Sequence, residues 1–130
     1  MRKVLSFVGV GILVTSTVYA HHSFSATYDS EKKVDLEGGL VQFAFRNPHA
    51  FLTLEAPDDK GELQKWSIEW SGAGQLASQG VTRETLKPGD RLIVHATRSR
   101  VPGEYRALMV NLKRPADGFT WGTAQGQTVE

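Results

Sequence analysis

The chain has 130 residues, which is a usual length for one domain, and it contains no cysteine. Its 15 basic and 14 acidic residues leave a formal net charge of +1. A charge so close to zero gives no electrostatic basis for binding nucleic acid, and the lack of cysteine excludes a disulfide framework. The hydrophobic core must therefore stabilise the fold unaided, which a chain of this length permits.

Residues 1–20 have the features of a cleaved secretory signal peptide. Two basic residues precede an apolar segment, and Val18-Tyr19-Ala20 resembles a signal-peptidase site. An uncleaved membrane anchor is the alternative, but the apolar segment is shorter than the ~20 residues that a spanning helix needs. We expect no transmembrane segment after cleavage, and a periplasmic or secreted location. The mature chain then has 13 basic and 14 acidic residues, a net charge of −1.

The strongest β-pattern is a bent hairpin over residues 34–55. Apolar residues fall on even positions before Gly38-Gly39 and on odd positions after it, so the pair predicts a β-bulge. Asn47-Pro48 predicts the turn, because proline has no N–H for a ladder bond. The second arm resumes with Leu52 and Leu54 on one face and the residues between them on the other.

Three further strands are expected after the hairpin. Alternating apolar residues predict them at about 62–70, 92–97 and 105–112, with the even positions from 108 to 112 facing inward. Between the third and fourth strands, helical spacing before Gly80 predicts one short helix. This element order predicts an all-β fold with small α content, a five-stranded OB-like antiparallel barrel. Another small antiparallel barrel or sandwich is the alternative.

The chain therefore divides into four parts. The signal peptide is followed by an N-terminal arm without periodicity at 21–33, and by the β-barrel domain at 34–112. Residues 113–130 are rich in Gly, Thr and Gln and predict a loosely ordered C-terminal tail.

Cleavage after Ala20 makes His21 the first residue of the mature chain, with His22 next. An N-terminal histidine offers two nitrogens to one metal ion, the α-amine and ring Nδ1, and a further imidazole completes a histidine brace. Imidazole suits copper and zinc, and affinity among divalent ions peaks at copper, so zinc is the less favoured metal. The third nitrogen could come from His22, His49 or His95, of which we favour His49. The alternative to a metal site is that His21 and His22 are solvated residues of a flexible arm.

A metal-free site would use one face of the barrel. Phe51, Trp66, Trp70 and His95 are its candidate residues, since aromatic side chains make binding platforms. For Trp66 and Trp70 core packing is the default interpretation, because they share a strand face with Ile68, and the binding platform is the alternative. No Gly-x-Ser-x-Gly nucleophile motif occurs, and the sequence assigns no catalytic residue.

Four motifs together resemble a family of short exported bacterial proteins catalogued as a domain of unknown function. They are His21-His22-Ser23-Phe24, Asn47-Pro48-His49, Trp66-Ser67-Ile68-Glu69 and Leu86-Lys87-Pro88-Gly89-Asp90. The similarity covers nearly the whole mature chain and departs at 98–105, where relatives tend to carry an Ala-Lys/Arg-Asp-Gly turn. The resemblance implies an exported single domain and supplies no activity.

Three functions follow as expectations. The first is a periplasmic metal-binding protein, for copper, with His21 as anchor and a role in storage, delivery or sensing. The second is a metal-free OB-type module that binds an envelope oligosaccharide, peptide or protein. The third is an oxidative copper enzyme, which we rank last because nothing else in the sequence resembles an oxygenase surface.

Overall fold

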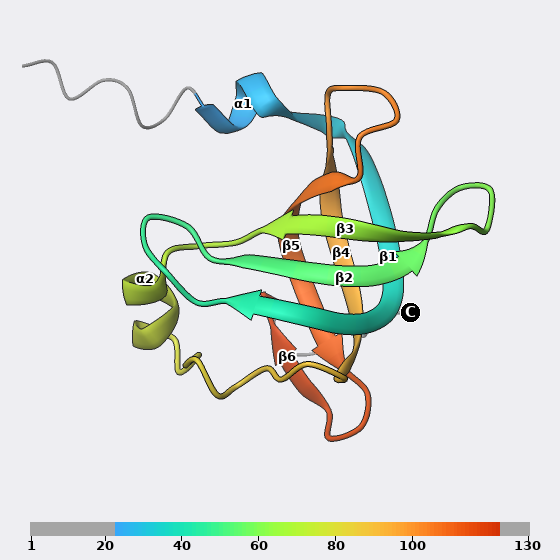
Figure 1. The fold of residues 1–130 in the computed structure, drawn as a ribbon. Coiled ribbons are helices and arrows are strands. Elements are labelled where there is room, and N and C mark those ends of the chain that lie inside the picture. Colours follow the sequence, from blue (N-terminus) through green and yellow to red (C-terminus); the bar gives the residue numbers. More distant parts are fainter. Residues whose placement is uncertain (1–22, 123–130) are drawn as a thin grey trace, which may run out of the picture.

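The computed structural model describes residues 23–122, which form six strands and two short helices (Figure 1). In chain order these are α1 (Ser23–Thr27), β1 (Tyr28–Ala44), β2 (Phe51–Pro57), β3 (Leu63–Glu69), α2 (Ala73–Ser78), β4 (Arg91–Ser99), β5 (Arg106–Arg114) and β6 (Phe119–Trp121). The all-β class and the short helix between the third and fourth strands are confirmed. No helix of the described part is long and apolar enough to cross a membrane.

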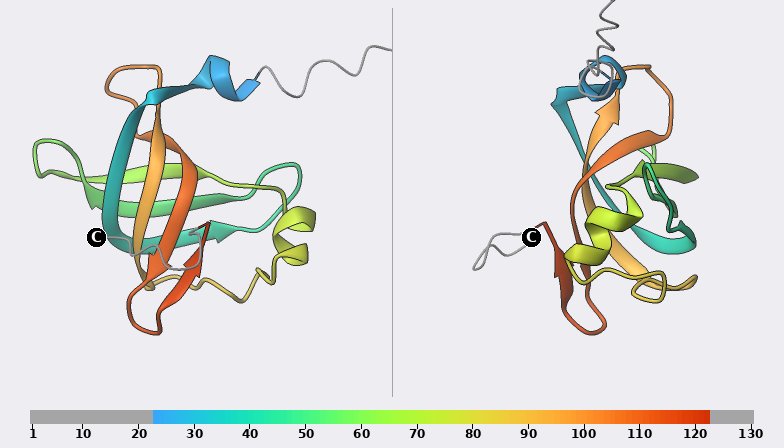
Figure 2. Two further views of the ribbon diagram at one scale, coloured as in Figure 1. Left: turned by 180° about the vertical axis from the view of Figure 1, so that it is seen from behind. Right: turned by 90° about the vertical axis from the view of Figure 1, so that its left-hand side faces the viewer.

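The strands form one sheet that closes on itself. β1 pairs with β4 along its earlier part and with β2 along its later part, and β2 pairs with β3. β5 pairs with β4 and, in parallel, with β3, so the ring runs β1–β2–β3–β5–β4. Figure 2 shows how β1 curves from its position beside β4 to its position beside β2. The other pairings are antiparallel, including that of β6 with the end of β5, on the same edge of β5 that pairs with β3.

The inner face of the ring carries the hydrophobic core. The alternation predicted for the hairpin's second arm and for β3 and β4 is confirmed, because the residues expected inside are almost fully buried. They are Leu52, Leu54, Trp66, Ile68, Trp70, Leu92, Val94 and Ala96. The predicted end of α2 is also found: Gly80 has a φ of +82°, and its N–H donates to the carbonyl of Ala77.

The bulge of β1 lies beyond the position predicted for it. Leu40 is still buried, Val41 is 43% exposed, and the register with β2 shifts between Leu40 and Gln42. Gly38 has a different role, since an added Cβ would lie 1.9 Å from the carbonyl oxygen of Glu55. The glycine therefore permits β1 to bend closely against β2.

The predicted face of β5 is wrong in part. Ala107 and Met109 are buried with Leu112, whereas Val110 is 37% exposed. The cause is a second bulge, because the register between β4 and β5 shifts at His95. An inserted residue reverses the faces of a strand, so the simple alternation cannot hold along its length.

The outer ends of the sheet also differ from expectation. β1 begins at Tyr28, inside the stretch expected to be an aperiodic arm, and the buried Tyr28 belongs to the folded body. β6 lies inside the stretch 113–130, which was expected to be loose, so the strands number six among residues 23–122 and not five.

Candidate functional site

A buried carboxylate, Glu69, lies at the end of β3 and is only 6% exposed. Oε2 accepts hydrogen bonds from Tyr28 Oη and from Arg106 Nη2, the latter at 3.1 Å. Oε1 lies 2.7 Å from Nδ1 of His49. A buried carboxylate requires such partners, because removing an unpaired charge from water is costly. We call these four residues the Glu69 cluster.

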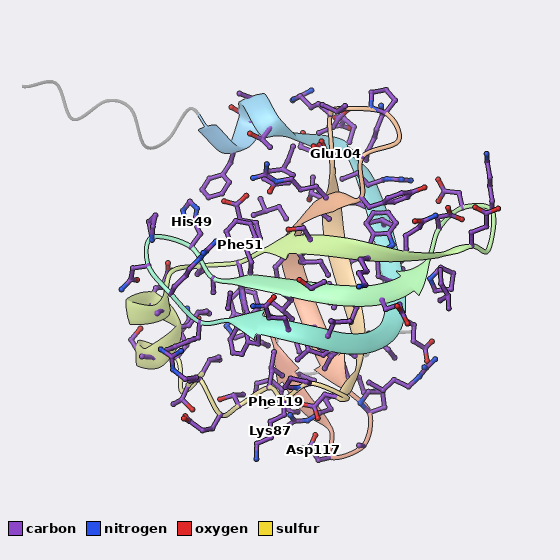
Figure 3. The ribbon with its side chains drawn as sticks, viewed as in Figure 1. His49, Phe51, Lys87, Glu104, Asp117 and Phe119 are labelled. Carbon is purple, nitrogen blue, oxygen red and sulfur yellow. The ribbon has the colours of Figure 1, made fainter. Side chains whose placement is uncertain are left out.

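Four segments far apart in the sequence supply this cluster. Tyr28 is the first residue of β1, Glu69 the last of β3 and Arg106 the first of β5. His49 comes from the loop between β1 and β2, next to the start of β2 at Phe51. Figure 3 shows His49 and Phe51 near one another on the side of the molecule that lies below α1. The closed sheet is what brings these strand ends together.

The start of α2 holds the loop that carries His49. Asn47 Oδ1 accepts a hydrogen bond from the N–H of Gly74 at 3.2 Å. Gly72 packs so closely against the loop that an added Cβ would lie 2.4 Å from the carbonyl oxygen of Pro48. The imidazole is therefore presented from an anchored loop.

The phenol of Tyr28 remains a neutral donor inside the cluster. Burial, and next the hydrogen bond to Glu69, raise the pKa of Tyr28 above its ordinary value near 10. Arg106 Nε donates to the same phenol oxygen at 3.0 Å and lowers this pKa, but by less than burial and Glu69 raise it. The phenol thus accepts from the guanidinium and donates to the carboxylate.

The hydrogen bond to Glu69 selects one tautomer of His49. A carboxylate can only accept, so Nδ1 carries the proton. In the neutral ring Nε2 carries a lone pair, and no residue among 23–122 forms a hydrogen bond with it. The side chain is 33% exposed, and its ring lies 5.1 Å from that of Phe24 in α1, measured between centroids. A histidine oriented by a carboxylate in this way is the usual form of a metal ligand in proteins.

His49 also lines a cavity of about 290 Å³. Phe24, Trp70 and Trp121 contribute aromatic side chains to its wall. Trp70 is 2% exposed, and its Nε1 finds no hydrogen-bond partner in the described part of the chain. His49 therefore lies at a cavity that is partly lined by aromatic side chains.

Of the other candidate ligands, only His95 lies within the described residues, and it is not part of the Glu69 cluster. His95 lies on β4, where its Nδ1 is 2.6 Å from Asp35 Oδ1 of β1. His21 and His22 lie outside the described residues. Among residues 23–122, no three His, Asp or Glu side chains are grouped so as to hold a metal ion.

The candidate binding face does not form one surface. Trp66 and Trp70 are in the hydrophobic core, as their shared strand face with Ile68 predicted. Phe51 and His95 are both partly exposed, and they lie on different strands with different partners.

Glu69, Tyr28 and Arg106 were not among the site residues predicted from the sequence. Tyr28 falls in the predicted arm, and Glu69 lies between Ile68 and Trp70, on the opposite face of their strand by the alternation. One signal was available, because Glu69 belongs to the Trp66-Ser67-Ile68-Glu69 motif that carried the family resemblance.

These features define a small all-β domain with a buried ionic cluster at the rim of a closed sheet. The chain belongs to the Family of unknown function (DUF6152), whose sequence profile matches residues 11–107. That range contains all four residues of the Glu69 cluster. The predicted membership in an uncharacterised family is thereby confirmed. None of the curated proteins compared with the chain matches it.

Proposed function

We propose that the protein is an exported, periplasmic copper-binding protein that holds Cu(II) through His21 and His49. Cleavage of residues 1–20 exposes the α-amine and Nδ1 of His21, and Nε2 of His49 is the third nitrogen. The observation that carries the proposal is the 2.7 Å contact between His49 Nδ1 and Glu69, which fixes the imidazole and leaves Nε2 as the ligand atom.

The connectivity of the chain supports this pairing. The ring of Phe24 contacts that of His49, and His21 precedes Phe24 by three residues in the sequence. Because consecutive Cα atoms are 3.8 Å apart, the Cα of His21 can lie at most about 11 Å from that of Phe24. This short link is compatible with the proposed pairing of His21 with His49. The tether is shorter still for His22, which remains a candidate ligand.

The donor set favours copper over zinc. Two imidazoles and an amine are nitrogen ligands that suit Cu(II). Among divalent first-row metal ions, copper binds most tightly to such sites. The ordinary pKa of an α-amine is near 8, so Cu(II) can displace its proton at neutral pH. Bound copper would serve storage, delivery or sensing.

The test is a Cu(II) titration followed by EPR on protein that begins at His21, with any tag at the C-terminus. We expect tight binding with a nitrogen-rich axial spectrum, and at least a tenfold loss of affinity when one residue is added before His21. His49→Ala should cause a similar loss. Cu(II) should also quench tryptophan fluorescence, because Trp70 borders the same cavity as His49.

His95→Ala is a matched control. Like His49, His95 is about one-third exposed and has Nδ1 paired with a carboxylate, but it lies on β4. Its replacement should leave copper affinity unchanged. Equal losses of Cu(II) affinity in His49→Ala and His95→Ala would refute the proposed site. So would a binding isotherm that is unchanged by the added N-terminal residue.

We also propose that the closed sheet is an OB-type barrel. The ring order β1–β2–β3–β5–β4, with α2 between β3 and β4, supports this architecture. In the proposal the barrel is the scaffold that presents the β1–β2 loop with His49. Superposition of an experimental structure on OB barrels is the test, and a strand path that differs from theirs would contradict it.

A further inference from the structure

A row of polar side chains crosses the outer face of the sheet. Gln42 of β1 pairs with Thr53 of β2, Thr53 pairs with Ser67 of β3, and Ser67 pairs with Arg106 of β5. Cross-strand partners project to the same face, and the sequence neighbours of Thr53 and Ser67 are core residues. The four side chains therefore lie side by side on the outside of the ring.

This row lines a groove of about 430 Å³, together with Arg46 and Phe51. Its polar groups are two guanidinium groups, one amide and two hydroxyls. No acidic side chain of residues 23–122 lines it. The groove thus combines positive charge with hydrogen-bond donors, which is the chemistry that recognises an oxyanion.

Arg46 is available to a ligand. Its guanidinium carbon lies 5.3 Å from the centroid of the Phe51 ring, and no carboxylate of the described part pairs with it. Its backbone is anchored, because its carbonyl oxygen accepts the N–H of Ala73 at 3.1 Å. The cation is therefore held at the rim of the groove without an acidic partner.

Arg106 is fixed in place from the other side. Its Nε and Nη2 bind Tyr28 and Glu69, at 3.0 and 3.1 Å. The side chain is nevertheless 39% exposed and lines the groove. A planar guanidinium anchored at one edge can still donate from the other, so the Glu69 cluster orients Arg106 for a ligand.

We infer that this groove binds a small hydroxylated ring compound bearing an oxyanion, either a sugar acid or a sugar phosphate. Arg46 and Arg106 bind the oxyanion, while Gln42, Thr53 and Ser67 bind hydroxyls. The partly exposed side chain of Phe51 contacts the apolar face of the ring. This site does not depend on the proposed copper site and requires no metal.

The experiment is calorimetric titration of the purified, metal-free protein with glucuronate, glucose 6-phosphate and glucose. We expect saturable binding of at least one of the two acids and none of glucose. Comparison of the two acids shows whether a carboxylate or a phosphate is preferred. Arg46→Gln should weaken binding of the acid about 10- to 100-fold, as expected for the loss of a charge-assisted hydrogen bond.

Arg83→Gln is the matched control. Arg83 also stacks on an aromatic ring, that of Phe45 at 5.8 Å, but it does not line the groove. Its replacement removes the same charge and should leave affinity unchanged. Thr53→Val, which keeps the shape of the side chain, should weaken binding several-fold. Absence of binding by both acids, equal binding of glucose, or equal effects of Arg46→Gln and Arg83→Gln would overturn the inference.

Discussion

Phe51 of β2 and Glu69 of β3 are direct cross-strand partners, and they occupy the boundary between two regions of the outer face. Phe51 lines the groove that contains Arg46, whereas Glu69 holds the imidazole of His49. Arg106 belongs to both regions, because it lines the groove and binds Glu69. The histidine and the groove are thus connected through one carboxylate.

Replacing the carboxylate of Glu69 tests whether it stabilises the fold and orients His49. Glu69→Gln keeps the shape of the side chain but removes the charge that pairs with Arg106 and orients His49. We expect a loss of about 1–3 kcal/mol in the free energy of unfolding, measured by urea denaturation. Copper affinity should fall about 10- to 100-fold, as for other changes at the partner of a ligating histidine.

Glu55→Gln is the control for that variant. Glu55 lies on β2 with its side chain exposed, and no hydrogen bond or ion pair involves this side chain in the described part. Its replacement should alter the free energy of unfolding by less than about 0.5 kcal/mol. If Glu69→Gln proved equally mild, the Glu69 cluster would have no structural importance.

Tyr28 predicts a loss of stability in alkaline solution. Its pKa in the folded protein is raised above the ordinary value near 10, so its contribution is fully present below that pH. Above about pH 10 the unfolded chain binds fewer protons than the folded one, and stability falls as pH rises toward the folded pKa. Tyr28→Phe should lack this component and be less stable by about 1–2 kcal/mol at neutral pH. Urea denaturation of the unmodified protein and of Tyr28→Phe from pH 7 to 11 would measure the free energy of unfolding and its pH dependence. Parallel curves of this free energy against pH would contradict the prediction.

The sequence predicts the core of this fold better than its site. The burial of Leu52, Leu54 and Ile68 can be predicted because apolar and polar residues alternate along their strands. This alternation can be read from a few consecutive residues. Val41 and Val110 were misplaced because a bulge reverses the faces, and only the partner strand shows where the extra residue lies.

Glu69 could not be recognised as buried from the alternation of β3. It stands at an outward position, where a polar residue is ordinary. Its burial results from Tyr28, His49 and Arg106, which the closed sheet brings over it from three other segments. His49 was identified from its residue type and its turn, but the carboxylate that orients it depends on tertiary contacts.

Arg114 joins the turn before β6 to the loop before β4, at the end of the molecule opposite α1, where Figure 3 labels Asp117 and Phe119. Its guanidinium binds both oxygens of Asp117, at 3.0 and 2.8 Å, and Asp90 at 2.8 Å. Lysine cannot reproduce this fork, so Arg114→Lys should lower the free energy of unfolding by about 1–2 kcal/mol.

Arg91→Lys provides the comparison for Arg114→Lys in the same denaturation assay. Arg91 pairs with Glu37, but both side chains are more than half exposed, and such pairs contribute little. We expect a change below about 0.5 kcal/mol. Equal effects at the two arginines would show that the fork of Arg114 contributes no more than an ordinary surface pair.

The Gly38-Gly39 pair offers the sharpest test of how β1 bends. An added Cβ at Gly38 would lie 1.9 Å from the carbonyl oxygen of Glu55, whereas at Gly39 it would meet nothing within 4 Å. Because the obstacle at Gly38 is backbone, β1 must move away from β2 to make room.

We expect Gly38→Ala to destabilise the protein by at least ~3 kcal/mol or to prevent folding, in line with severe backbone clashes. Gly39→Ala should be neutral or stabilising by up to about 1 kcal/mol, since it restricts the unfolded chain. Thermal unfolding followed by circular dichroism would measure the difference. Similar melting temperatures for the two variants would show that β1 does not approach Glu55 closely at Gly38.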